Sequence, residues 1–193
     1  MTREGEGERV QVTQSKIPSS PSFVVEESSF FRKWDRLPSP TEVQARAKTQ
    51  QAAGVYPDPR RIDSMAAPYV RPPPAVFEEM GLFVKWGSSV QLSEAQCLYA
   101  VRQFLKGDVP VPEVYGWRTD EDEKYIYMEY VNGISLEQAW SIMGHDDKAA
   151  ICRELRTVYQ RLRQLEQEPE HRFIGANTHV VLITSSRWLI FLS

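Results

Sequence analysis

Lys85 and Glu94 are the residues whose types and spacing could do chemistry. Lys85 stands inside the apolar run "LFVKWG" (82–87), which is typical of a buried strand. Glu94 follows nine positions later, at the start of an amphipathic helical pattern. A buried ammonium is costly unless it is paired, and an unpaired one tends to lose its proton. We therefore expect Glu94 to pair with Lys85, with a strand-edge lysine that reaches water as the alternative.

Local patterns predict the elements that must position this pair. Residues 75–87 read as two short strands around a turn at Gly81. Residues 90–106 read as a helix, with Ser93 and Gln96 at the spacing of a capping box. Two extended segments and then two helices follow, so the order predicts an α+β fold with a small, mostly antiparallel sheet and one helix.

The second of the late helices has a clear apolar face. Its members recur at helical spacing and are Ile151, Leu155, Val158, Leu162 and Leu165. Burying five such side chains is worth on the order of 10 kcal/mol, so the face needs a partner. Within the sequence, the expected partner is the apolar segment 177–193, and the chain is expected to be marginally stable.

Composition limits the remaining possibilities. Residues 1–66 are polar and rich in Pro and Ser, so we expect them to be largely disordered, with a short helix near 41–53. The net charge of −3 gives no reason to expect nucleic acid or a membrane as partner. Cys97 and Cys152 fit reduced core thiols, which indicates an intracellular, cytoplasmic protein. No signal peptide is visible, and the apolar end is too short to span a bilayer.

Four segments in order resemble one family. The segments "PPPAVFEEMGLFVKWG", "SEAQCLYAVRQFL", "VPVPEVYGW" and "YIYMEYVNGISLEQAW" resemble the aminoglycoside phosphotransferase and choline kinase-like proteins, especially their fungal members. The resemblance covers roughly residues 69–175. It implies a protein-kinase-like small lobe over 67–132, then the start of a helical large lobe over 133–176.

The resemblance implies ATP as the cofactor. In this fold a strand lysine binds the α- and β-phosphates, and a helix glutamate orients it; Lys85 and Glu94 match these two roles. The segment "MEYVNG" resembles the hinge between the lobes. It would place Met128 beside the adenine, with backbone groups of Glu129 and Val131 bound to the base and Tyr130 between them.

The sequence also departs from the family pattern. No G-x-G-x-x-G loop precedes Lys85, and the hairpin around 75–80 would cover the phosphates instead. The family's H-G-D or H-x-D loop and its magnesium-binding Asp have no counterpart. The only similar stretch, His145-Asp146-Asp147, reads as the acidic first turn of a helix. No residue is therefore assigned to catalysis or to metal binding.

The resemblance to the family stops near the end of the sequence. The segment "RFIG" (172–175) matches the family, and the apolar text after it does not. We therefore expect a truncated ATP-dependent small-molecule phosphotransferase that keeps the nucleotide-binding lobe and is inactive alone. The acceptor of its relatives would be a small molecule of unknown identity. The alternatives are a non-catalytic, pseudokinase-like binding module, an inert truncated product, or a small α+β fold unrelated to kinases.

Overall fold

The computed structural model describes residues 8–54 and 72–167. The chain divides into two compact units. The sheet unit comprises Ser19–Ala95 and Pro112–Val131, and the helical unit comprises Met1–Pro18, Gln96–Val111 and Asn132–Ser193. Strands and helices are both present, so the α+β class is confirmed. Residues 177–193, expected as an apolar tail, lie outside the described residues.

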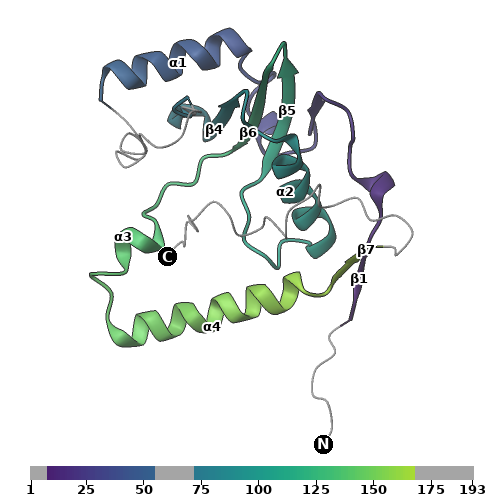
Figure 1. Ribbon diagram of the computed structural model, residues 1–193, viewed down its shortest axis with the longest axis vertical. Coiled ribbons are helices and arrows are strands. Elements are labelled where there is room, and N and C mark those ends of the chain that lie inside the picture. The colour runs from purple at the N-terminus through teal and green to yellow at the C-terminus, as the bar shows by residue number, and fades with distance from the viewer. Residues whose placement is uncertain (1–7, 55–71, 168–193) are drawn as a thin grey trace, which may run out of the picture. The chain divides into compact units, whose positions relative to one another are not determined.

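The sheet unit is built on one five-stranded antiparallel sheet (Figure 1). Its strand order is β2-β5-β6-β4-β3. The bounds are β2 Phe23–Val24, β3 Ala75–Phe77, β4 Leu82–Gly87, β5 Val114–Asp120 and β6 Glu123–Glu129. The long central strands β4, β5 and β6 are those in which Val, Ile, Tyr and Trp gather, as strand propensity favours.

The hairpin expected over 75–87 is present. A short 3₁₀ helix, η4 (Glu78–Met80), joins β3 to β4 and ends at Gly81. Gly81 has a φ of 59°, the left-handed region that glycine adopts at low cost. Strand β4 then pairs with β6 in unbroken register, from Leu82 opposite Glu129 to Gly87 opposite Lys124. This register fixes the face of the sheet on which Lys85 lies.

The opposite face of the sheet carries a large core cluster. Side chains from β4 and β6 pack there against the helix α1 (Pro40–Ala52) and the 3₁₀ helix η2 (Phe30–Arg32). The cluster includes Phe30, Leu37, Val43, Ala47, Leu82, Val84, Tyr125 and Tyr127. The Gln50 side chain also bonds both the N–H and the C=O of Val76, so α1 covers backbone groups of the edge strand β3.

This packing corrects the expectation of disorder for residues 8–54, while residues 1–7 and 55–66 lie outside the described residues. Residues 8–54 are described, and they contribute α1, where a helix near 41–53 is expected, and the edge strand β2. The apolar residues that they bury are spread singly along a polar segment. The composition of such a segment is polar on average, so it does not reveal single apolar residues that become buried against the sheet.

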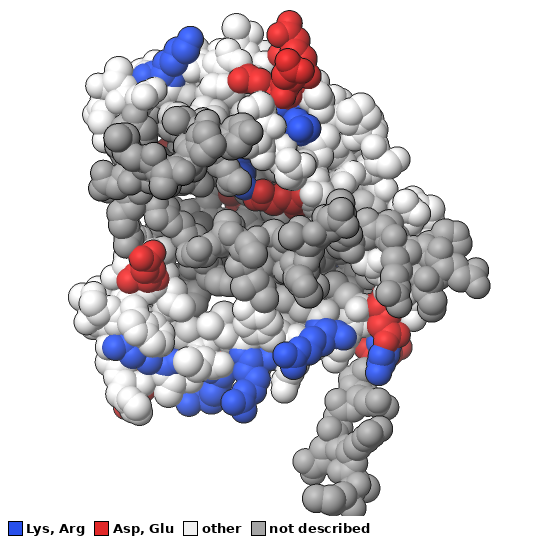
Figure 2. Space-filling model, viewed as in Figure 1, with Lys and Arg blue, Asp and Glu red and all other residues white. Residues whose placement is uncertain are grey.

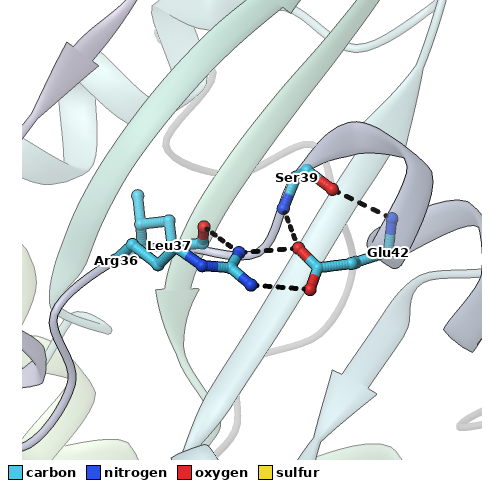
Figure 3. A network of polar contacts seen from close by, with 4 residues as sticks. All are labelled: Arg36, Leu37, Ser39 and Glu42. Carbon is cyan, nitrogen blue, oxygen red and sulfur yellow. Dashed lines mark hydrogen bonds and ion pairs between the residues drawn. The ribbon is translucent and has the colours of Figure 1, made fainter.

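A polar network fixes the start of α1 (Figure 3). Ser39 is the N-cap: its Oγ accepts from the Glu42 N–H at 3.3 Å, and its own N–H donates to Glu42 Oε2 at 2.7 Å. Arg36 donates two further hydrogen bonds to the same carboxylate, at 2.7 and 2.9 Å. The hydrogen bonds from Arg36, and then that from Ser39, hold the pKa of Glu42 at about 2, below its ordinary 4.5.

The network should make the stability of α1 depend on pH. Glu42 binds a proton more weakly in the folded state, so its contribution is present above pH 4.5 and is lost as the pH falls toward 2. We expect Glu42→Gln to lower the free energy of unfolding at pH 7 by less than about 1 kcal/mol, because the side chain is half exposed. Urea unfolding at pH 7 and pH 2.5 should show the difference from the wild type shrinking in acid. Glu27→Gln, at an exposed site in the same segment, is the control; a pH-independent deficit would contradict the prediction.

The helical unit contains most of α2 (Leu92–Leu105), with α3 (Leu136–Ala139) and α4 (His145–Leu162). The strand β1 (Val10–Val12) pairs in parallel with β7 (Leu165–Gln167), and η1 (Gln14–Lys16) follows β1. A capping box of Ser135 and Gln138 starts α3. The one expected at Ser93 is wrong, because α2 begins at Leu92 and the Gln96 side chain bonds the Pro18 carbonyl instead.

Part of the apolar face of α4 packs against α2 and β1 within the helical unit. Val158, Leu162 and Leu165 pack against a buried cluster of Val101, Leu105 and Val109, together with Val10 of β1. These contacts come from α2 and the N-terminal strand. The partner expected from the sequence, residues 177–193, lies outside the described residues, so that expectation stays a prediction. The helix itself ends at Leu162, and Leu165 joins the cluster from the strand β7.

The other side of α4 is polar. Figure 2 shows Lys and Arg side chains gathered along this helix, which carries Lys148, Arg153, Arg156 and Arg161. Arg161 pairs with Asp108, while Cys152 is exposed, so the expectation that Cys152 is a core thiol is wrong. No helix in the described ranges combines the length and apolar character needed to cross a bilayer.

Candidate nucleotide-binding site

The ion pair that the sequence predicts is present in the sheet unit. The Lys85 Nζ donates a hydrogen bond to Glu94 Oε2, and the two groups form a salt bridge. The Lys85 side chain is 16% exposed and that of Glu94 is 37% exposed. Lys85 is therefore not a strand-edge lysine that extends into water; its charge is largely desolvated and is compensated by the first turn of α2.

The register of β4 and β6 shows which predicted residues share a face with Lys85. Lys85 lies opposite Ile126, and Phe83, two residues earlier, lies opposite Met128. Alternate residues of a strand point to the same side, so Phe83, Lys85 and Met128 project from one face. Met128 is the diagonal neighbour of Lys85 across the two strands, and residues in such positions lie about 7–8 Å apart. The structure thus brings Lys85, Glu94 and Met128 to the same side of the sheet.

Phe83 was not singled out by the sequence patterns. It occupies the same face as Lys85 and is only partly buried, in contrast to the fully buried Leu82 and Val84 on either side. The signal available in the sequence is the period of two in "LFVK". It places Phe83 and Lys85 on one face of the strand, and Leu82 and Val84 on the other face, toward the core. An apolar run hides this signal because both faces of the strand are apolar.

The backbone after β6 is partly committed to internal hydrogen bonds. The Glu129 N–H donates to the Glu113 carbonyl at 2.8 Å, and the Tyr130 N–H donates to the Gly81 carbonyl at 2.8 Å. The Val131 N–H has no hydrogen bond to the part of the chain that the structure describes. Of the backbone groups that the resemblance assigns to the base, the Val131 N–H is therefore available as a donor.

The aromatic residues around the site pack rather than form a ligand cage. Tyr125 and Tyr127 are buried in the core cluster, and the Trp86 ring stacks on Tyr125 at 6.0 Å. Burial raises the pKa of Tyr127 to about 12, so its hydroxyl stays neutral. Burial also raises the pKa of Tyr125, whose hydroxyl donates to Glu123 at 2.6 Å. Neither phenol is a candidate proton carrier near neutral pH.

The acidic stretches that the sequence singles out lie in a helix first turn and in a hairpin turn. Asp146 and Asp147 lie in the first turn of α4, and the Gly144 N–H donates to Asp147 Oδ2 at 3.3 Å. The turn between β5 and β6 holds Glu121 and Asp122, both exposed. Among the described residues, no three His, Cys, Asp or Glu side chains are grouped so that they could hold a metal ion.

No family model, curated protein or solved structure matches the chain. The case for a function is therefore carried by the residues of the site and by the resemblance in sequence pattern.

Proposed function

We propose that the sheet unit is the nucleotide-binding lobe of a small-molecule kinase similar to the aminoglycoside phosphotransferases. Lys85 binds the α- and β-phosphates of ATP, and Glu94 holds the ammonium in the direction of the phosphates. The observation that carries the proposal is the largely desolvated Lys85 charge, which is paired with the first turn of α2. Replacing a buried ion pair by apolar side chains of similar size often leaves the stability of a protein unchanged or raises it. Stability alone is therefore a weak reason for this pair, which favours a role in binding.

The geometry suits a triphosphate. A lysine ammonium is a compact charge with three donors, and it gains strength as a phosphate ligand where water is scarce. Phe83, which is partly buried, and Met128, which is 7% exposed, are apolar neighbours on the same side of the sheet, and the base would lie beside them. The Val131 N–H and the Glu129 carbonyl would bind the edge of the base.

The proposed activity of this chain is binding and not turnover. In full-length relatives of the proposed family, magnesium accompanies the triphosphate, and a catalytic loop accepts the proton of the acceptor hydroxyl. No residue of the described ranges is assigned to either task. The acceptor, a small molecule of unknown identity in the relatives, would bind outside the sheet unit. The runner-up is a chain that binds no nucleotide at all.

Thermal unfolding in the presence of ATP and magnesium tests the proposal. A ligand that binds only the folded state stabilises it by about 2.7 kcal/mol at a hundred times its Kd, which gives a shift in Tm of several degrees. We expect this shift for the wild type and for Lys48→Ala, an exposed lysine of α1. We expect none for Lys85→Ala. Equal shifts in both variants, or no shift in the wild type, would contradict the proposed function.

A further inference from the structure

Ser29 makes two hydrogen bonds to one carboxylate. Its Oγ donates to Glu113 Oε2 at 2.5 Å, and its N–H donates to Glu113 Oε1 at 3.3 Å. Ser29 stands immediately before η2, in the N-terminal segment, and Glu113 stands immediately before β5. Because each oxygen of the Glu113 carboxylate accepts a hydrogen bond from Ser29, both the position and the orientation of the carboxylate are fixed.

Glu113 is in turn bound to the end of β6 in both directions. The Glu129 N–H donates to the Glu113 carbonyl at 2.8 Å, and the Glu113 N–H donates to Glu129 Oε2 at 3.1 Å. Glu129 is the last residue of β6 and, with Val131, one of the two residues whose backbone groups would bind the base. A chain of hydrogen bonds therefore runs from Ser29 through Glu113 to Glu129.

Ser29, where this series of hydrogen bonds begins, lies in a segment that is well anchored. Phe30, next to Ser29, is 3% exposed and lies 5.1 Å from the ring of Tyr115 in the core cluster. The backbone of Val25 bonds the Tyr115 carbonyl, and β2 pairs with β5. The N-terminal segment is thus held to β5 on both sides of Ser29, so the serine can act as a fixed support.

We propose that Ser29, acting through Glu113, is a positioning residue for the backbone of Glu129–Val131 that binds the nucleotide base. This inference rests on the proposed function. It makes the N-terminal segment, which composition alone predicts to be disordered, a part of the nucleotide site. The segment supports the base end of the site, while Lys85 and Glu94 serve the phosphate end.

Two ligands separate these ends experimentally. ATP contacts both ends, whereas inorganic tripolyphosphate contacts only Lys85. Loss of the Ser29 hydroxyl lets the backbone of Glu129–Val131 leave the binding conformation in the free protein, so it should raise the Kd for ATP by up to about tenfold, the worth of one hydrogen bond. It should leave the Kd for tripolyphosphate unchanged. Lys85→Met should raise both Kd values.

The variants are chosen to isolate the hydroxyl. Ser29→Ala removes it, Ser29→Thr keeps it and should restore ATP binding, and Ser29→Asp opposes the Glu113 carboxylate and should weaken ATP binding further. Ser19→Ala is the matched control, because Ser19 is exposed in the same segment and makes no hydrogen bond to the described residues. Calorimetric titration of the full chain measures each Kd.

The outcomes distinguish the two claims. If the wild type binds ATP and Ser29→Ala binds it equally well, the positioning inference is wrong and the proposed function stands. If Ser29→Ala loses both ligands in equal proportion, the residue acts on the fold in general, and the inference is again wrong. If the wild type binds neither ligand, the proposed function fails and the inference fails with it. Faster amide exchange at Glu129 and Tyr130 in Ser29→Ala alone would add support without any ligand.

Discussion

Glu94→Gln is expected to destabilise the protein more than Lys85→Met, although Lys85 is the more deeply buried of the two residues. Without the Glu94 carboxylate, the Lys85 ammonium stays largely out of water and has only an amide dipole for a partner. Leaving a buried donor unsatisfied costs about 1–3 kcal/mol and a charged donor costs more, so we expect a loss of at least about 1 kcal/mol. With Lys85→Met the buried charge itself is gone, and Glu94 is exposed enough to be solvated. That change should cost less than about 1 kcal/mol.

Nucleotide binding should give the opposite order for the same two variants. Lys85→Met removes the charge that would bind the phosphates, whereas Glu94→Gln keeps the charge and loses only its orientation. Urea unfolding without ligand and calorimetric titration with ATP and magnesium provide the two measurements, with an unchanged m-value required for the comparison. The reversal of order is the specific expectation, because a pair that serves only the fold would show one order in both assays or no binding to compare.

An exposed ion pair in the same unit provides the control. Arg46 and Glu79 form a salt bridge in which the Glu79 side chain is 53% exposed. Glu79→Gln should change the free energy of unfolding by less than about 1 kcal/mol and leave nucleotide binding unchanged. If Glu94→Gln is as mild as Glu79→Gln, the desolvated charge at Lys85 is less costly than its burial indicates, and the main support for the site is lost.

The ion pair could be predicted from the sequence because both of its causes are local. A lysine in an apolar strand needs a counter-charge, and Glu94 lies in the first turn of the next helix, only nine positions along the chain. The β3–β4 hairpin, α2 and the long central strands follow from similarly local patterns. The face that Lys85 shares with Met128 could not be read in this way, because it depends on the register between β4 and β6.

The N-terminal segment shows the limit of composition as a guide. Val25, Phe30, Leu37 and Val43 are all buried, but they are separated by polar residues without a helical or strand period. Such residues are ordered by a surface that already exists, the core face of the sheet, and not by each other. That surface forms only when the strands within residues 75–129 pair, which a local sequence pattern in the N-terminal segment cannot show. Ser29 was invisible for the same reason, since its partner Glu113 lies 84 positions away.

Leu105→Ala is expected to be among the most destabilising single changes in the helical unit. Leu105 is fully buried at the end of α2, in the cluster that covers the apolar face of α4. A buried leucine truncated to alanine loses its transfer free energy and leaves a cavity, at a cost of about 2–5 kcal/mol. A domain has only about 5–15 kcal/mol in total, so this one change removes a large share. Gln103→Ala, at an exposed site of the same helix, should stay within about 0.5 kcal/mol.

The location of the damage makes this prediction specific. Amide exchange should accelerate in α4 and in the β1–β7 pair, which share the cluster with Leu105, and should change little in β4 and β6 of the sheet unit. Exchange that rises equally in both units would show that they unfold as one. A Leu105→Ala variant as stable as Gln103→Ala would show that α2 does not cover α4. The apolar face of α4 would then need another partner, as the sequence predicts with residues 177–193.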